Sequence, residues 1–247
     1  MGTAGVRIVL AGVLAYPVVV LMLVKATLLG VLDSFFLAGL VQLLPTLALG
    51  QIVLARGVVI ERVPAYLNSG SSILLLGASG LFMGRGLVGL SGLGLEAPWS
   101  VANLVWTGVL VVVGIGTLLV FLVIRRVLQI EETELVHELM PVTGKEKSLF
   151  SVLSICAGFG EEMAYRGYAI SALVVATGSA TFALVLTSAT FGVLHAYQGP
   201  IGVVRTGVIG LIMGGAFLYT GSLWPPIVAH ALIDLVVGLV LKERLLS

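Results

Sequence analysis

Ionisable side chains inside apolar segments constrain this chain more than any other feature of its sequence. An unpaired charge in hydrocarbon costs about 2.5–3.5 kcal/mol on insertion scales, so such residues are retained where they have a partner and usually a function. Carboxylates, imidazoles and a guanidinium at membrane depth are the components of an active site. The candidates are Glu161, Glu162, Arg166, His195, His230 and Asp234.

The composition supports a membrane location for these groups. Hydrophobic residues make up 59% of the chain and charged residues only 10%, whereas a soluble domain usually carries about 25% charged residues. With a net charge of +1, the chain lacks the excess of basic residues that is typical of nucleic-acid binding, so no nucleic-acid partner is expected. Cys156 is the single cysteine, which excludes an internal disulfide and a cysteine-based zinc cluster. The fold class predicted is an all-α polytopic membrane protein.

Apolar segments of about 20 residues are long enough to cross a bilayer as helices. The sequence predicts about eight such spans, and the third is rich in glycine and carries Arg85, which favours a broken or partly interfacial helix. The predicted spans lie near Val6–Leu29, Phe35–Ala55, Leu67–Leu90, Val101–Ile124, Leu149–Val175, Thr181–Tyr197, Ile201–Tyr219 and Pro226–Leu241.

Basic residues fall mostly on one side of these spans, which predicts that both termini and the loop Arg125–Ser148 are cytoplasmic. The loop is expected to form a solvated surface helix that ends at Pro141 and Gly144. This expectation rests on its acidic residues Glu131, Glu132, Glu134 and Glu138.

The spacing of the first acidic motif suggests a division of roles. Glu162 and Arg166 are four residues apart, so they share a helix face and are expected to form an ion pair. Glu161 points about 100° away from that face, which leaves it free to act as a general base. The alternative is that all three residues form one structural network.

The two histidines differ in their context. His195 follows Phe191 by one helical turn and precedes a break at 198–200, and taken alone it could be an ordinary core residue. His230 and Asp234 are four residues apart on one helix face, and a carboxylate behind an imidazole orients the ring and selects its tautomer. In the predicted spans, His195 and His230 lie near opposite ends of their helices, so tilted or broken helices are needed to bring both to Glu161.

This set of groups suits peptide hydrolysis without a nucleophilic side chain. A Glu and a His can hold a water and remove its proton, while a second His donates to the oxyanion. The same Glu and two His could instead hold a divalent metal such as zinc. Because the sequence lacks His-Glu-x-x-His, the common zinc helix is absent, and the cofactor stays open between none and such a metal.

Two other functions are compatible with parts of the sequence. Gly77-Ala78-Ser79-Gly80 has the Gly-x-Ser-Gly form of rhomboid-type serine proteases, with His230 as the base. Buried Glu, His and Asp residues also form proton relays, so a proton-coupled transporter or a non-catalytic membrane scaffold is the alternative from a different class.

Three motifs occur in order on separate apolar helices. They are Glu-Glu-x-x-x-Arg at 161–166, Phe-x-x-x-His at 191–195 and His-x-x-x-Asp at 230–234, the last preceded by Gly-Ser-Leu-Trp-Pro-Pro. Together they resemble the type II CAAX prenyl endopeptidase family, also called the Abi or CPBP group of intramembrane proteases. The resemblance covers roughly Leu139 to Leu241, and the first four spans match only in character.

The resemblance implies an eight-helix bundle with its site in a cavity within the membrane. By analogy, Glu161 and His195 activate the water, while Glu162 and Arg166 support the site. His230 and the residue at 234 would stabilise the oxyanion. The prenyl-protease pattern more usually has Asn where this chain has Asp234, so we expect Asp234 to orient His230 instead.

The resemblance also divides the chain and names its partners. Residues 1–138 would be N-terminal transmembrane helices and a cytoplasmic loop, and residues 139–247 the catalytic helices, within one integral membrane domain. The expected partners are the lipid bilayer and a peptide or membrane-protein substrate. The small size resembles the prokaryotic members, which indicates a multi-pass protein of a prokaryotic plasma membrane.

Overall fold

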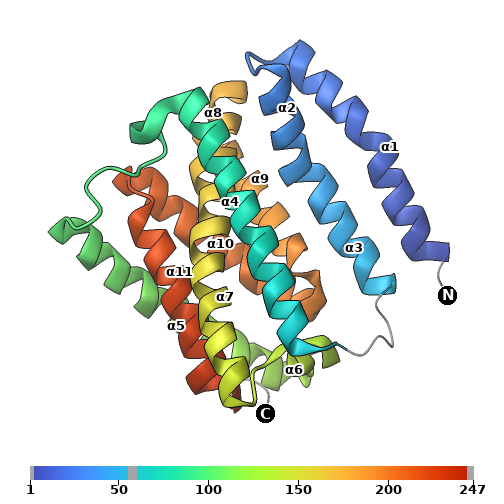
Figure 1. The fold of residues 1–247 in the computed structure, drawn as a ribbon, viewed down its shortest axis with the longest axis vertical. Coiled ribbons are helices and arrows are strands. Elements are labelled where there is room, and N and C mark those ends of the chain that lie inside the picture. Colours follow the sequence, from blue (N-terminus) through green and yellow to red (C-terminus); the bar gives the residue numbers. More distant parts are fainter. Residues whose placement is uncertain (1–2, 55–59, 244–247) are drawn as a thin grey trace.

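The computed structural model describes residues 3–54 and 60–243, and every element in those ranges is helical (Figure 1). Six helical segments of this described part are long and apolar enough to cross a membrane. Large apolar side chains are exposed along most of them, as lipid-facing surfaces require. The protein is therefore an all-α polytopic membrane protein, as the composition predicts.

The elements follow one another with short connections. In chain order they are α1 (Thr3–Ala26), α2 (Val31–Ala38), the π-helix η1 (Gly39–Leu43), α3 (Leu44–Leu54), α4 (Arg62–Gly92), α5 (Val101–Leu128), α6 (Glu134–Leu139), α7 (Gly144–Glu162), the π-helix η2 (Met163–Ile170), α8 (Ser171–Thr177), α9 (Ala180–Leu194), the 3-10 helix η3 (Ala196–Gln198), α10 (Gly199–Thr220), α11 (Trp224–Val236) and the π-helix η4 (Val237–Leu241).

Each of the eight predicted spans falls on a helical segment, although the boundaries differ by a few residues. The first helix begins at Thr3 and ends at Ala26, before the predicted end at Leu29. The predicted end of the second span, Ala55, lies outside the described residues. Two of the predicted spans are not among the six helices that are long and apolar enough to cross a membrane. α9 is apolar but short, and the fifth span is built from α7, η2 and α8 in succession.

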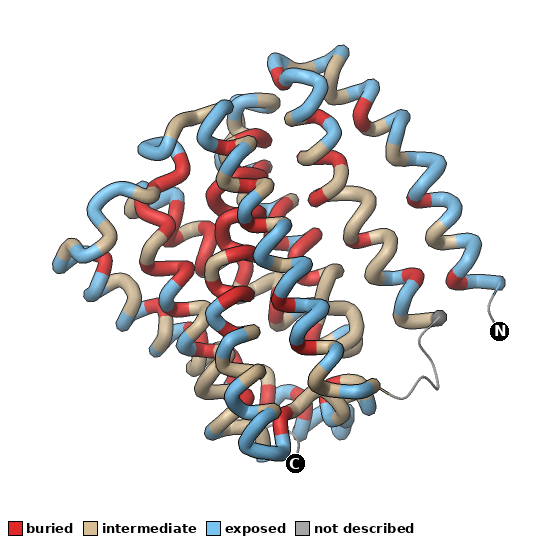
Figure 2. Tube along the Cα trace, in the orientation of Figure 1, coloured by how far each residue is buried: buried red, intermediate tan, exposed pale blue. Residues whose placement is uncertain are grey.

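The fifth span forms the centre of the bundle. α7 packs between α4 and α11, α5 covers α11, α10 packs on α9, and α1 packs on α3 at one flank (Figure 1). Figure 2 shows buried positions gathered along the central helices, whereas α1 is exposed along most of its length. Residues that carry chemistry are therefore best shielded from lipid on α7 and η2.

All eight residues of η2 are buried, including three large polar side chains. The Tyr165 hydroxyl donates to the Leu40 carbonyl at 3.0 Å, and the Tyr168 hydroxyl to the Asp33 carbonyl at 3.0 Å. Because an unsatisfied polar group in the interior is costly, these bonds tie η2 to α2 and η1. The third side chain, Arg166, belongs to the candidate site.

The glycine-rich α4 is interrupted as the sequence favours, but close to its end. Its non-helical residue is Gly89, with φ 72°, which marks a kink between two helical stretches. The remaining glycines allow close approach to the fifth span instead: a Cβ on Gly77 would lie 2.5 Å from Gly160 Cα, and one on Gly80 would lie 3.1 Å from Ala164 Cα. Small residues at such a crossing let two backbones pack directly.

The shortness of α9 resolves the mismatch in depth between the two histidines. With 15 residues, α9 is about 22 Å long, shorter than the roughly 30 Å hydrocarbon core. His195 therefore ends its helix inside the bundle, and η3 leads at once into α10. α11 begins at Trp224, with prolines in its first turn, and reaches His230 within two turns.

The loop after α5 corrects another expectation. A short helix, α6, does form, and it ends just before Pro141 as predicted. Glu132, however, is not a solvated residue, because its side chain is only 6% exposed and lies 2.9 Å from Arg125 and 3.0 Å from Arg205. Sequence patterns identify acidic residues in a loop, but not the arginines that other helices bring to them.

The close packing of α4 on α7 predicts a strong difference between two glycines of one helix. Gly77→Ala should lower the free energy of unfolding by about 1–3 kcal/mol, because the new methyl group overlaps the backbone at Gly160. Gly86→Ala is the matched control, since nothing lies within 4 Å of its Cβ position. Thermal unfolding in detergent measures both, and equal midpoints would contradict this packing.

Candidate active site

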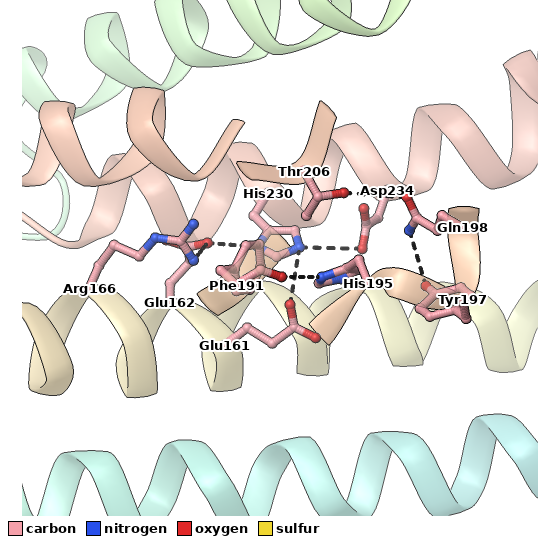
Figure 3. Close-up of polar contacts among 10 residues, drawn as sticks. All are labelled: Glu161, Glu162, Arg166, Phe191, His195, Tyr197, Gln198, Thr206, His230 and Asp234. Carbon is pink, nitrogen blue, oxygen red and sulfur yellow. Dashed lines mark hydrogen bonds and ion pairs between the residues drawn. The ribbon is translucent and has the colours of Figure 1, made fainter. Parts of the chain in front are cut away.

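A cavity of about 700 Å³ runs through the centre of the bundle. Side chains of α3, α4, α6, α7, α9, α10 and α11 line it, and all six candidate residues lie on its wall. Figure 3 shows them together with their polar contacts. Three separate helical segments therefore bring the three sequence motifs to one space.

Glu162 lies at the centre of the polar contacts. It is fully buried, and Arg166 Nη1 donates to its Oε1 at 3.0 Å, so the predicted ion pair is confirmed. His230 Nδ1 approaches the same Oε1 at 2.8 Å. Since a carboxylate oxygen accepts, we assign a proton to Nδ1 of His230. Glu162 therefore links its own helix to α11 as well as to η2.

Arg166 contacts a third helix through its guanidinium face. Its Cζ lies 4.1 Å from the centre of the Phe191 ring on α9, a cation–π arrangement. The Phe191 ring in turn lies 4.8 Å from the His195 ring and 6.3 Å from the His230 ring, centre to centre. The Phe191 side chain thus packs against Arg166 and lies beside both imidazoles.

Glu161 is not ion-paired with Arg166, as the helical spacing predicts. Its Oε2 lies 3.9 Å from His230 Nε2, beyond hydrogen-bond distance, and has no hydrogen-bond partner among the described residues. The side chain is 16% exposed, and that exposure is to the cavity. Adjacent carboxylates of α7 therefore face the two nitrogens of one imidazole, and only one of the carboxylates is paired.

The carboxylate that orients His230 is not the one that the sequence suggests. Asp234 Oδ2 lies 3.6 Å from His230 Nε2, which is an ion-pair separation and not a hydrogen bond. Glu162, on another helix, makes the hydrogen bond through Nδ1 instead. The (i, i+4) spacing places Asp234 near the His230 ring, but the contact that Glu162 makes with this ring from another helix is shorter.

His195 is oriented by the end of its own helix. Its backbone N–H bonds to the Gly192 carbonyl, so the Phe191 carbonyl is available to accept from the ring Nδ1 at 2.9 Å. A carbonyl can only accept, which assigns the proton to Nδ1. In the neutral ring, Nε2 is then the basic nitrogen, and the side chain lies on the cavity wall.

Residues 145–236 match the family model described as type II CAAX prenyl endopeptidase Rce1-like. This part of the chain is similar to the Rce1-like domains of the CAAX protease family. At the family level the similarity supports a CAAX-protease-type intramembrane endopeptidase, and it implies a bilayer context and a peptide or protein substrate. No significant match was found among curated proteins or solved structures.

The matched segment contains further polar cavity residues that the sequence motifs do not include, and two of them lie next to His195 in the chain. Tyr197 and Gln198 follow His195 in η3, and the Gln198 side-chain amide donates to the Tyr197 hydroxyl at 3.2 Å. The only sequence signal was the helix break at 198–200. Ser79 lies outside the cavity lining, and its hydroxyl donates to the Leu75 carbonyl at 2.8 Å, so the serine-protease alternative lacks a site.

The donor groups of the Rce1-like site do not converge as metal ligands. Within the described residues, no three His, Cys, Asp or Glu side chains form a group that could hold a metal ion. His230 already uses Nδ1 for Glu162, and His195 uses Nδ1 for a carbonyl. The acid–base reaction proposed for this site therefore uses side chains and no metal.

The buried pair in the Rce1-like domain makes Arg166 the residue whose loss should cost most stability. Arg166→Ala leaves the fully buried Glu162 carboxylate without its cation, at a cost of about 3–5 kcal/mol. Arg85→Ala is the control, because Arg85 lies exposed on α4 and such changes stay within about 0.5 kcal/mol. Unfolding in detergent compares the two, and a small effect of Arg166→Ala would refute the assignment.

Proposed function

We propose that this protein hydrolyses a peptide bond inside the bilayer with a water activated by Glu161 and His195. The observation that carries the proposal is the Glu161 carboxylate, whose Oε2 has no hydrogen-bond partner, on the same cavity wall as the basic Nε2 of His195. A general base must first lie within reach of the proton that it removes, and its pKa matters only after that. Glu161 and His195 both face the cavity. Glu162 is less suited to this role, because Arg166 and His230 hold its Oε1 and its side chain is fully buried.

The proposed reaction needs no nucleophilic side chain. Water held between Glu161 and His195 loses a proton as its oxygen forms a bond to the substrate carbonyl carbon. His230 acts here as an imidazolium: its Nδ1–H is held by Glu162, and its Nε2–H donates to the developing oxyanion. The tetrahedral intermediate then collapses, the C–N bond breaks, and the proton passes from Glu161 to the departing amine.

The proposed substrate is a membrane-associated peptide or protein. The cavity wall formed by α3 and α4 is mainly apolar, including Leu44, Ile52, Ile73 and Leu76. The polar groups are gathered at the other side, on α7, α9 and α11 (Figure 3). An extended peptide with apolar side chains fits this division, since its carbonyl can face the polar wall while its side chains face the other. The proposed location is the cell membrane.

Removing the free carboxylate should abolish hydrolysis without unfolding the protein. In Glu161→Gln the side chain keeps its size but loses its basicity, so turnover should fall at least a hundredfold, the lower range of a general base's contribution. Cleavage products from a peptide library, identified by mass spectrometry with purified protein in liposomes, measure the effect. Glu131→Gln, at an exposed loop position, is the control and should match wild type.

Full turnover in Glu161→Gln would reject the general-base assignment. Proton-coupled flux without any cleavage product would instead favour a relay. Ser79→Ala should cleave normally, and a membrane-permeant zinc chelator should leave the rate unchanged. Loss of activity with the chelator, restored by added zinc, would replace the proposed mechanism with a metal-dependent one.

The separation of Asp234 from His230 predicts a graded response at position 234. Asp234→Asn keeps the shape of the side chain, and Glu162 still orients the ring, so most turnover should survive. Asp234→Ala removes a polar group from the cavity wall and should reduce turnover about tenfold, the effect of roughly one hydrogen bond. Single-turnover rates on the same peptide compare the two, and an inactive Asn variant would show that a carboxylate is required.

A further inference from the structure

The turn that presents His195 is stabilised by little of its own structure. It consists of His195 and the three residues of η3, and Gly199 follows with φ 79°. A left-handed residue of this kind costs any side chain other than glycine. The backbone bonds of the turn region are short-range, from His195 N to Gly192 O, from Gln198 N to His195 O and from Gly199 N to Ala196 O. Its conformation therefore depends on contacts from elsewhere.

The loop between α5 and α6 supplies one of these contacts directly. Thr133 Oγ1 donates to the Tyr197 carbonyl at 2.7 Å, across 64 residues of chain. The methyl group of the same side chain, Cγ2, lies 3.3 Å from where a Cβ on Gly199 would be. One side chain of this loop thus bonds to Tyr197 within η3 and lies beside Gly199, the residue that follows η3.

The preceding residue, Glu132, holds the turn through a second route. Arg205 Nη1 lies 3.0 Å from Glu132 Oε1, and Arg205 Nη2 donates to Gln198 Oε1 at 2.9 Å. Arg125 lies 2.9 Å from the same carboxylate oxygen. The three charged side chains are only 6–13% exposed, so the pairing is not weakened by bulk water as a surface ion pair is.

Gln198 carries this route into the cavity. Its carbonyl oxygen accepts from Arg205 and, at 3.3 Å, from Thr206. These two donors assign the positions of the oxygen and the nitrogen in the side-chain amide. The amide nitrogen then donates to the Tyr197 hydroxyl, whose ring centre lies 5.9 Å from that of His195 (Figure 3). The loop is therefore connected to a ring beside His195 through an unbroken series of polar contacts.

We propose that Glu132 and Thr133 are positioning residues for hydrolysis, because they hold the turn that sets His195 against the cavity. Neither residue contacts the cavity's reacting groups, and both precede the segment 145–236 that matches the family model. Only the expected change in kcat rests on the proposed function. The structural coupling between the loop and the turn can be measured separately.

The test compares Thr133→Val with Thr133→Ser in the full-length protein in liposomes. Valine keeps the shape but cannot donate to the Tyr197 carbonyl, whereas serine keeps the hydroxyl. Thr143→Val is the matched control, because Thr143 caps α7 as Thr133 caps α6 but does not contact η3. Glu132→Gln is a second, independent variant that weakens the Arg205 route.

Hydrogen exchange of the peptide covering 195–198 gives a readout that needs no activity. Thr133→Val and Glu132→Gln should exchange there about five- to tenfold faster than wild type, the factor for one net hydrogen bond in local opening. Thr133→Ser and Thr143→Val should exchange as wild type does. With a cleaved peptide, the first two variants should lower kcat about tenfold and leave KM unchanged.

Unchanged exchange at 195–198 in both variants would overturn the proposal, as would faster exchange with an unchanged kcat. An equal increase in every peptide would also overturn it, because the contacts would then support the whole fold and not this turn. If wild type cleaves no peptide, the proposed function fails, while exchange still decides whether the loop holds the turn.

Discussion

The buried pair of Arg166 and Glu162 is the interaction on which the rest of the site depends. In a medium of low polarity neither charge is tolerated alone, so their pairing at 3.0 Å permits both to lie in the bundle. Glu162 also holds His230 on α11, and the guanidinium lies over Phe191 on α9. A single ion pair on the fifth span therefore sets the relative positions of three helices.

The same pairing explains why two adjacent glutamates differ. The Arg166 side chain reaches only the helix face of Glu162, so Glu161 makes no ion pair with it and faces the cavity. Because adjacent residues of a helix point in different directions, the Glu162 carboxylate supports the structure while the Glu161 carboxylate faces the cavity. The short α9 adds the matching imidazole, because a helix that stops inside the bundle places its terminal residue beside the cavity.

Local patterns predicted several of these features correctly. Each of the eight predicted apolar spans falls on a helical segment, because burial in lipid imposes a composition that neighbouring residues share. The spacing from Glu162 to Arg166 predicted their ion pair, since both partners lie on one helix. It could not identify Glu162 as the partner of His230, because that contact joins residues 68 apart in the chain.

By itself, the sequence determined the membrane class, the approximate helices and six of the polar residues that line the cavity, since each depends on composition or on spacing within one helix. Tertiary structure alone decided how far α9 extends, which carboxylate holds His230 and where Glu132 lies. Glu132 resembled a solvated loop residue until α5 and α10 brought Arg125 and Arg205 to it. The physical reason is that burial and charge pairing are properties of packed helices, and no segment carries them alone.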